Sequence, residues 1–285
     1  MISTAFAYSR ATSLDDALAK LRATNGEGKF IAGGHSLVPL MKLRLSEPHT
    51  LIDIARIPEL RGIRKKGDTI EIGAGTVHHE VATSVLLQQE CPVVAEVAAS
   101  IGDPQVRNRG TLGGSLAHAD PSADYPAVML ALDADIQLKS AKGSRVVKAH
   151  NFFRGLFTVD LAPDEIIVGV QFRPVKCAAY AKLYQRASHF AIVGVAAALD
   201  VDKKTIRSAR IGVTGASSHA TRLTDVEEQL AGKELSMRSI EAAARLAGAG
   251  LADINSDIHA SEEYRRAMIP VFTERALARA LARAS

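Results

Sequence analysis

Hydrophobic and polar positions divide the chain into short strands and helices in a mixed order. Ser13 is a predicted helix N-cap with Asp16 three residues on, close to a capping box, and ALAKLRA continues with helical spacing. An apolar run at residues 30–32 ends at two glycines. Ser36 is then expected to cap a second helix, LVPLMKLRL, and residues 50–54 have the pattern of a strand. The first segment therefore combines helices with strands.

Two hairpins follow, LRGIRK with TIEIG and ADIQLKS with SRVVKAH, each around a Lys-Gly turn. Residues 77–101 are predicted to be a long apolar helical stretch interrupted at Cys91-Pro92, and helix returns at residues 125–132. Residues 102–124 are polar and show no period, so we expect a long loop. Loops of that length inside compact domains are more often functional than idle.

The pattern changes after residues 165–172, which predict a strong strand. Arg173-Pro174 is an expected boundary, beyond which three strand-like runs (AYAKLYQ, AIVGVAAALDV and TIRSARIGVTG) precede alanine-rich helices. Hairpins and a mixed order of elements predict an α+β fold with a separate C-terminal domain of antiparallel sheet and helices.

Composition narrows the classes of function. The 285 residues are 47% hydrophobic and 23% charged, as in an ordinary globular protein. A net charge of +4 with interspersed signs, no Trp and 5% aromatic residues argue against nucleic-acid binding. No signal-peptide pattern and no apolar run of about 18 residues is present, which predicts a protein that does not span a membrane.

Two cysteines, Cys91 and Cys177, stand in unrelated contexts. This argues against a disulfide framework and favours a reducing, cytoplasmic location. An iron–sulfur cluster needs about four thiolates, so any such cluster belongs to another chain.

Two glycine pairs are the main candidate binding motifs: Ala32-Gly33-Gly34-His35-Ser36 and Thr111-Leu112-Gly113-Gly114-Ser115. Adjacent glycines let the backbone approach a phosphate and turn N–H groups toward it, and a following helix adds partial positive charge. A lone pair is more often a plain turn, but two such loops could grip a pyrophosphate from both sides.

Other nucleotide motifs are missing. The run from Gly62 to Gly67 is followed by Asp68 where a P-loop needs Lys, and His78 stands where a dinucleotide fingerprint beginning at Gly73 needs its third glycine. A P-loop ATPase and an ordinary Rossmann protein are therefore excluded.

Three long motifs, FIAGGHSLVPLMKLRL, QVRNRGTLGGSLAHADPSADYPAVMLAL and EIIVGVQF, together resemble the FAD-binding medium subunit of molybdenum hydroxylases, the xanthine dehydrogenase and carbon monoxide dehydrogenase family. The resemblance covers essentially the whole chain. It implies a two-subdomain FAD-binding fold of the vanillyl-alcohol-oxidase type at residues 1–175, with subdomains at about 1–56 and 57–175. It also implies a C-terminal domain at 176–285.

The resemblance implies non-covalent FAD binding through two phosphate loops and several flanking residues. The implied contacts are Ile31, Ala32, Gly33, Gly34, His35, Ser36, Leu37, Ile101, Thr111, Leu112, Gly113, Gly114, Ser115, Asp124, Ile166, Ile167 and Tyr184. Asp124 matches an acidic residue that binds FAD hydroxyls, which suits a carboxylate acceptor. Ser115 replaces a frequent Asn and His189 a frequent Asp, so the resemblance carries Tyr184 and Phe190 over only weakly.

The resemblance further implies two partners, a small subunit with two [2Fe-2S] clusters and a large molybdopterin subunit, in a dimer of heterotrimers. Electrons would pass through the clusters to FAD and on to an external acceptor. A stand-alone FAD-dependent oxidoreductase is the alternative, and a non-catalytic assembly subunit is another. We find no catalytic acid–base pair in the sequence, and we predict no metal site.

Other polar groups have plainer interpretations. His78, His79 and Glu80 are expected to be solvated, because adjacent histidines on a helix diverge. Arg107 and Arg109 could neutralise phosphate or form salt bridges. The arginines of the last helix are expected to form a solvated or partner-facing stripe: Arg265, Arg266, Arg275, Arg279 and Arg283.

Overall fold

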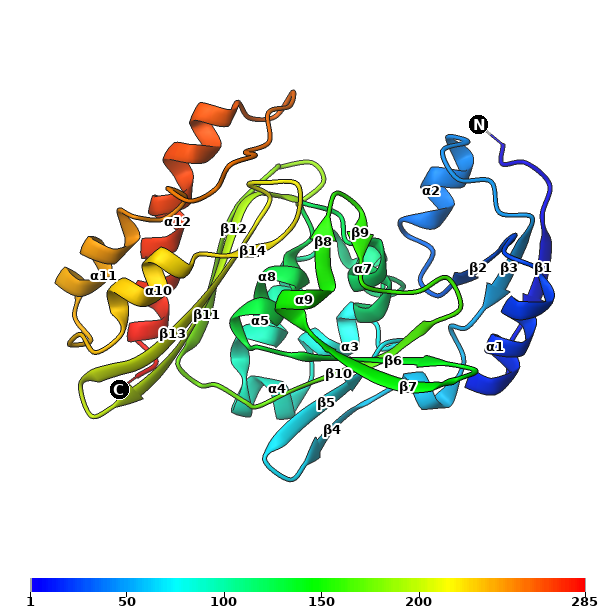
Figure 1. Ribbon diagram of the computed structural model, residues 1–285, viewed down its shortest axis with the longest axis horizontal. Coiled ribbons are helices and arrows are strands. Elements are labelled where there is room, and N and C mark those ends of the chain that lie inside the picture. Colours follow the sequence, from blue (N-terminus) through cyan, green and yellow to red (C-terminus); the bar gives the residue numbers. More distant parts are fainter. Residues whose placement is uncertain (1, 285) are drawn as a thin grey trace.

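The computed structural model describes residues 2–284, which form three consecutive units, each built around its own sheet (Figure 1). The first sheet is parallel, and the sheets of the middle and C-terminal units are antiparallel. This is the predicted α+β fold with a separate C-terminal sheet and helix domain.

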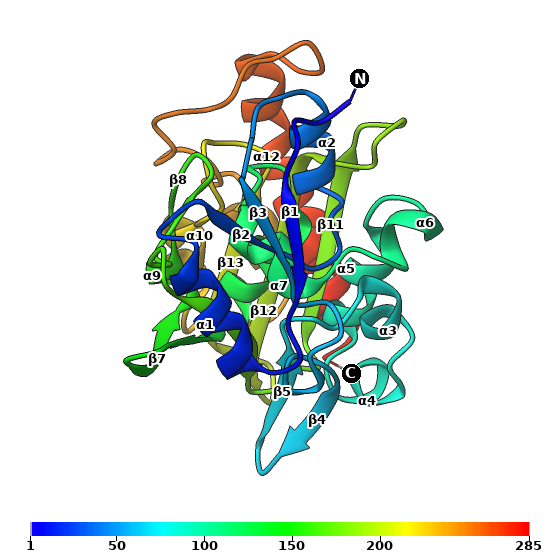
Figure 2. The same ribbon diagram turned by 90° about the vertical axis from the view of Figure 1, so that its right-hand side faces the viewer.

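The first unit contains a three-stranded sheet in the order β1-β3-β2, shown from its own side in Figure 2. The predicted cap of the first helix is confirmed, because Ser13 Oγ accepts a hydrogen bond of 3.1 Å from the Asp16 N–H. Ser36 precedes the second helix but makes no side-chain cap. The elements are β1 (Ala7–Arg10), α1 (Leu14–Ala23), β2 (Gly28–Ile31), α2 (Leu37–Lys42) and β3 (Thr50–Asp53).

The middle unit contains a five-stranded sheet in the order β4-β5-β10-β6-β7, and both predicted hairpins are confirmed within it. Its strands and short 3₁₀ helix are η1 (Pro58–Leu60), β4 (Ile63–Lys66), β5 (Thr69–Gly73), β6 (Asp135–Ser140), β7 (Gly143–Lys148), β8 (Phe153–Gly155), β9 (Thr158–Val159) and β10 (Ile166–Phe172). Its α-helices are α3 (His78–Ala82), α4 (Val85–Glu90), α5 (Pro92–Ser100), α6 (Pro104–Arg107), α7 (Leu112–His118), α8 (Asp124–Ala131) and α9 (Ala149–Phe152).

Two predictions for the middle unit were wrong in detail. The stretch at residues 77–101 is three helices, because Ser84 caps a new helix in addition to the break at Cys91-Pro92. The expected loop at residues 102–124 contains α6 and α7, which are capped by the side chains of Asp103 and Thr111. Both helices are too short to show a hydrophobic period in the sequence.

The C-terminal unit contains a four-stranded sheet in the order β11-β12-β13-β14 with helices packed on it (Figure 1). Its elements are β11 (Ala178–Tyr184), β12 (Ala191–Asp202), β13 (Thr205–Thr214), β14 (Thr221–Arg222), α10 (Thr224–Leu230), α11 (Met237–Ala244) and α12 (Glu262–Leu281). Between residues 2 and 284, no helix has both the length and the apolar character needed to cross a bilayer.

The arginine stripe predicted for the last helix was wrong for Arg265, which is buried, whereas Arg279 is exposed and Arg283 half-buried. Arg265 is 2% exposed and donates through Nη1 to the carbonyl oxygens of Ile192 and Gly215. Arg279 donates to Tyr180 O at 2.8 Å and Arg283 donates to Ala178 O, so both bind the backbone of β11. Long guanidinium side chains can reach unpaired carbonyls of a neighbouring strand, which charge counting along a helix does not reveal.

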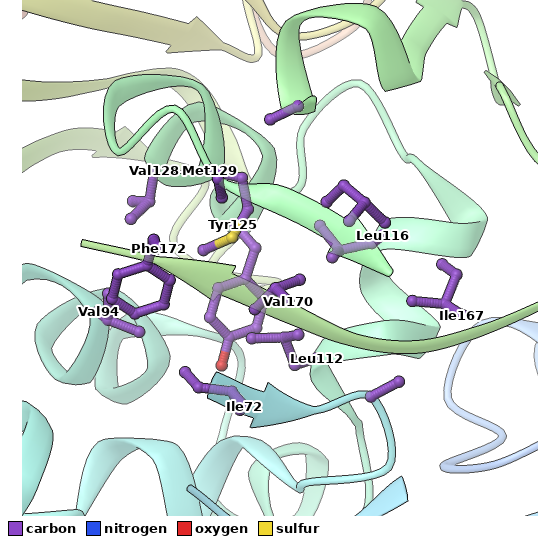
Figure 3. Close-up of a cluster of buried hydrophobic side chains, with 14 of the residues drawn as sticks. Ile72, Val94, Leu112, Leu116, Tyr125, Val128, Met129, Ile167, Val170 and Phe172 are labelled. Carbon is purple, nitrogen blue, oxygen red and sulfur yellow. The ribbon is translucent and has the colours of Figure 1, made fainter. Parts of the chain in front are cut away.

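Helix α8 joins the middle and C-terminal units, and every one of its residues is buried. A Cβ built on Gly212 of β13 would meet the backbone of Ala127, so glycine is what allows this strand to approach the helix. On the other side, Tyr125 packs with Ile72, Leu112 and neighbouring apolar side chains (Figure 3). The middle and C-terminal units therefore share one apolar core at this helix.

Candidate functional site

A cavity of about 940 Å³ lies where the three units meet. All but two of the residues implied as cofactor contacts line it: Ile31, Ala32, Gly33, Gly34, His35, Ser36, Leu37, Ile101, Thr111, Gly113, Gly114, Ser115, Asp124, Ile166 and Ile167. Leu112 and Tyr184 do not, because the Leu112 side chain is buried in the core (Figure 3) and Tyr184 is half-exposed beside His189. Segments far apart in the sequence thus form one concave site.

The first glycine loop presents backbone donors to this cavity. Among the described residues, no acceptor bonds the N–H groups of Gly33, Gly34, His35 and Ser36. Gly34 has φ +74°, a left-handed conformation that glycine adopts without strain. Consecutive unpaired N–H groups around a left-handed residue form a concave anion site, so this loop can bind a phosphate.

Gly33 of the first glycine loop packs against Arg109 and Gly110, which lead into the second glycine loop. A Cβ built on Gly33 would lie 2.8 Å from Gly110 Cα and closer still to the Arg109 carbonyl oxygen. Any side chain at residue 33 would therefore separate the loops. The second loop must also stay close to β5, since a Cβ on Gly113 would overlap Ala74.

The second glycine loop differs from the first in its backbone donors. The N–H groups of Leu112 and Gly113 donate to Thr76 O and Ala74 O at 3.0 and 2.8 Å. The Gly114 N–H donates to Thr111 Oγ1 at 3.1 Å. These three N–H groups are already paired within the protein, whereas the sequence suggested that they would be free for a phosphate. The second loop therefore contributes side-chain groups and close backbone packing to the cavity wall.

Asp124 lies at the cavity wall and is bound by two residues of the C-terminal unit. Tyr180 donates its hydroxyl to Asp124 Oδ1 at 2.5 Å, and Lys182 donates to Oδ2 at 2.9 Å. Lys182 also donates to Ser100 O, next to the cavity residue Ile101. A carboxylate has about four acceptor positions, so Asp124 keeps the capacity to accept from a ligand.

His78 is the main cavity residue that the sequence interpretation missed. We expected it to be solvated, but it is 5% exposed, and a Cβ on Gly110 would meet its Nε2 at 2.6 Å. Its Nδ1 is buried without a hydrogen-bond partner among the described residues. Burial lowers the pKa of His78 to about 4, and electrostatic interactions with His35 and Arg107 act in the same direction. His79 and Glu80 are exposed, as predicted.

Arg107 has a structural role at the cavity. Its Nη1 donates to the carbonyl oxygens of Ile101 and Gly102, both at 2.9 Å. The guanidinium therefore holds the turn after α5 through backbone carbonyl oxygens. Other lining residues, from the β8–β9 hairpin and the segment before β10, carried no sequence signal: Phe157, Thr158, Val159, Leu161, Ala162, Pro163 and Asp164.

Comparisons with known proteins agree with this arrangement. Residues 4–175 match the family described as FAD binding domain in molybdopterin dehydrogenase, and residues 178–280 match the CO dehydrogenase flavoprotein C-terminal domain. The chain is 38% identical to the carbon monoxide dehydrogenase medium chain of Hydrogenophaga pseudoflava, over 99% of both chains.

A second relative is the 6-hydroxypseudooxynicotine dehydrogenase complex subunit alpha of Paenarthrobacter nicotinovorans. It is 42% identical over 98% of this chain and 95% of that one. Among solved structures, the carbon monoxide dehydrogenase from Hydrogenophaga pseudoflava that lacks the Mo-pyranopterin moiety superposes with a TM-score of 0.95. That match has 39% identity and covers 99% of both chains.

Proposed function

Because the chain belongs to the family of FAD-binding medium subunits of molybdenum hydroxylases, we propose that it is the electron-transferring flavoprotein subunit of such a complex. It would receive electrons from [2Fe-2S] clusters on a small partner subunit and pass them to an external acceptor. Substrate would be oxidised on a large molybdopterin subunit. The observation that carries the proposal is the run of N–H groups at residues 33–36, which have no acceptor within residues 2–284 and open onto a cavity of about 940 Å³.

The residues present fit FAD. The cavity volume lies at the upper end of the range for ligand sites, as a dinucleotide requires. The N–H groups of Gly33 to Ser36 would hold the pyrophosphate, and Ser115 and Asp124 offer polar atoms for its hydroxyls. Bound FAD supplies the redox chemistry by accepting and donating electrons singly or in pairs.

The chain's own residues bind, orient and shield the cofactor. Gly33 keeps the two loops in contact, and Arg107 holds the turn at Ile101. Apolar side chains such as Ile166 and Ile167 exclude water from part of the wall. Lys182, bound to Asp124, fixes the C-terminal unit against this wall.

Electron transfer would depend on partners. The two cysteines are too few for a cluster, Cys91 is buried, and burial raises the pKa of its thiol to about 11. A thiol that stays protonated does not bind iron. We propose a small iron–sulfur subunit and a large molybdopterin subunit as partners, assembled as a dimer of heterotrimers in the cytoplasm.

The test begins with the purified full chain. We expect about one FAD per chain after reconstitution, released by acid and identified by chromatography. Under anaerobic conditions, dithionite should bleach the flavin absorbance, whereas candidate hydroxylase substrates should not. Adding both partner subunits should make the bleaching substrate-dependent.

Two outcomes would contradict the proposal. Release of FMN, or failure to bind flavin, would exclude the FAD assignment. Bleaching of the isolated chain by an organic substrate would favour the alternative, a stand-alone FAD-dependent oxidoreductase.

A further inference from the structure

Residues 185–190, between β11 and β12, form a closed turn with its own internal hydrogen bonds. The N–H groups of Gln185 and His189 donate to the carbonyl oxygens of Phe190 and Gln185, at 2.9 and 2.8 Å. The side-chain oxygen of Gln185 accepts from the N–H groups of Ala187 and Ser188, both at 2.6 Å. The turn is therefore a compact unit that closes the hairpin of β11 and β12.

His189 provides an outside contact. Its Nδ1 lies 2.8 Å from the carbonyl oxygen of Gly102, which belongs to the middle unit. A carbonyl oxygen only accepts, so Nδ1 carries the proton in this contact. The bond therefore joins the turn at residues 185–190 to the turn after α5.

The backbone at His189, which makes this contact, is in a left-handed conformation. Its φ is +62°, a left-handed conformation that costs a residue other than glycine free energy. Histidine, asparagine and aspartate are the side chains that most often adopt it. Strain of this kind persists only where surrounding contacts offset it.

The acceptor side is also held firmly. Gly102 O accepts a second hydrogen bond from Arg107 Nη1, and Gly102 itself has φ +51°. A Cβ on Gly102 would lie 2.9 Å from Val106, so this turn is packed tightly against α6. His189 therefore docks on a rigid feature of the middle unit.

Both sides of the contact face the cavity, since Ile101, Gly102 and Val106 line it on one side and Ser188, His189 and Phe190 on the other. We propose that His189 is a positioning residue. Its hydrogen bond to Gly102 holds the turn at residues 185–190 in place as a wall of the cofactor cavity. This inference rests on the proposed function, because the ligand of the cavity is taken to be FAD. It predicts that FAD affinity depends on the donor at Nδ1 and on no other property of the imidazole.

Three variants of the full chain test this. In His189→Asn, the side-chain NH₂ is attached to Cγ as Nδ1 is in histidine, and asparagine tolerates positive φ, so the bond to Gly102 is kept. His189→Gly tolerates the backbone conformation but removes the donor. Ala187→Gly is the matched control, because it adds the same flexibility at an exposed residue of the turn and leaves the bond in place.

The measurement is the FAD dissociation constant of each chain, obtained by titration followed through flavin fluorescence. A net hydrogen bond corresponds to a factor of roughly ten. We therefore expect His189→Gly to bind FAD about tenfold more weakly, and His189→Asn and Ala187→Gly to stay within about twofold of the parent chain. Thermal unfolding of each variant without FAD should show that all of them fold.

Other patterns would overturn the inference. Equal weakening in His189→Asn and His189→Gly would show that the imidazole matters and the bond does not. Unchanged binding in His189→Gly would remove the positioning role. If the parent chain itself does not bind FAD, the proposed function fails, which is distinct from a failure confined to His189.

Discussion

The ammonium group of Lys182 lies 2.9 Å from a carboxylate oxygen of Asp124, and both side chains are at most 7% exposed. Lys182 belongs to β11 of the C-terminal unit, whereas Asp124 begins α8 of the middle unit. Burial raises the pKa of Asp124, while the charge of Lys182 and the hydroxyl of Tyr180 act in the opposite direction. The ion pair therefore offsets the desolvation free energy of a carboxylate that is buried at a junction between two units.

Removing Lys182 should be costly because it leaves that carboxylate without its counter-charge. We expect Lys182→Met to lower the free energy of unfolding by about 3–5 kcal/mol, measured by urea denaturation. The double variant Lys182→Met/Asp124→Asn should recover much of the loss, since it no longer buries a charge. A double variant as unstable as Lys182→Met alone would contradict this account.

Gly33→Ala should weaken FAD binding by about tenfold or more, because the added methyl group would push the two glycine loops apart where donors must face phosphate. Gly155→Ala is the matched control. Apart from the adjacent residues of the chain, the nearest described atom to its new methyl group is Thr158 Cβ at 4.0 Å, and Gly155 does not line the cavity. Flavin content after gel filtration would check both, and full retention by Gly33→Ala would mean that these loops are ordinary turns.

His78 should make the protein less stable in mild acid. Its pKa is about 4 in the folded chain and about 6.5 when unfolded. Between these values the unfolded state binds more protons, so stability falls as pH drops from about 6.5 toward 4. From pH 7.5 to pH 5 this amounts to roughly 2 kcal/mol by proton linkage.

A neutral replacement, His78→Gln, isolates this effect, because the other titrating groups are common to both chains. Urea denaturation at pH 7.5 and pH 5 should show a loss about 2 kcal/mol smaller in the variant than in the parent chain. Identical pH dependence in the two chains would show that His78 protonates without penalty.

Arg265 and Arg266 are neighbours in α12 with opposite environments. Arg265→Met should cost about 3–5 kcal/mol of unfolding free energy, because it leaves two buried carbonyl oxygens unpaired and removes the partner of Asp257. Arg266→Met should cost less than about 0.5 kcal/mol, since the one ion pair of Arg266 within the described part of the chain is with exposed Glu262 on its own helix. Chemical denaturation of both variants tests this, and equal losses would contradict it.

Local signals explain what could be predicted from the sequence. The hairpins follow from alternation around Lys-Gly turns, and Ser13 predicted a cap that forms. The glycine pairs marked both loops of the cavity because such dipeptides stand out from the surrounding pattern. Three long motifs in a fixed order then made the family recognisable from the sequence.

The features that could not be predicted from the sequence depend on contacts between distant segments of the chain. Asp124 and Lys182 are 58 residues apart, so nothing local links them. His78 was predicted to be solvated because adjacent histidines on a helix diverge, yet packing of α3 under Gly110 buries it. Arg265 illustrates the same limit, since its acceptors Ile192 and Gly215 lie on strands and turns far from α12.

Arg279 of α12 and Arg283, just beyond that helix, also determine how the C-terminal sheet meets other molecules. β11 is an edge strand, and an edge with unpaired backbone groups is a template for a strand from another chain. Arg279 and Arg283 already bind the carbonyl oxygens of Tyr180 and Ala178 along this edge. An incoming strand would have to displace both guanidinium groups, so this border resists edge-to-edge aggregation. A subunit that approaches it would be recognised through side chains and not through β-augmentation.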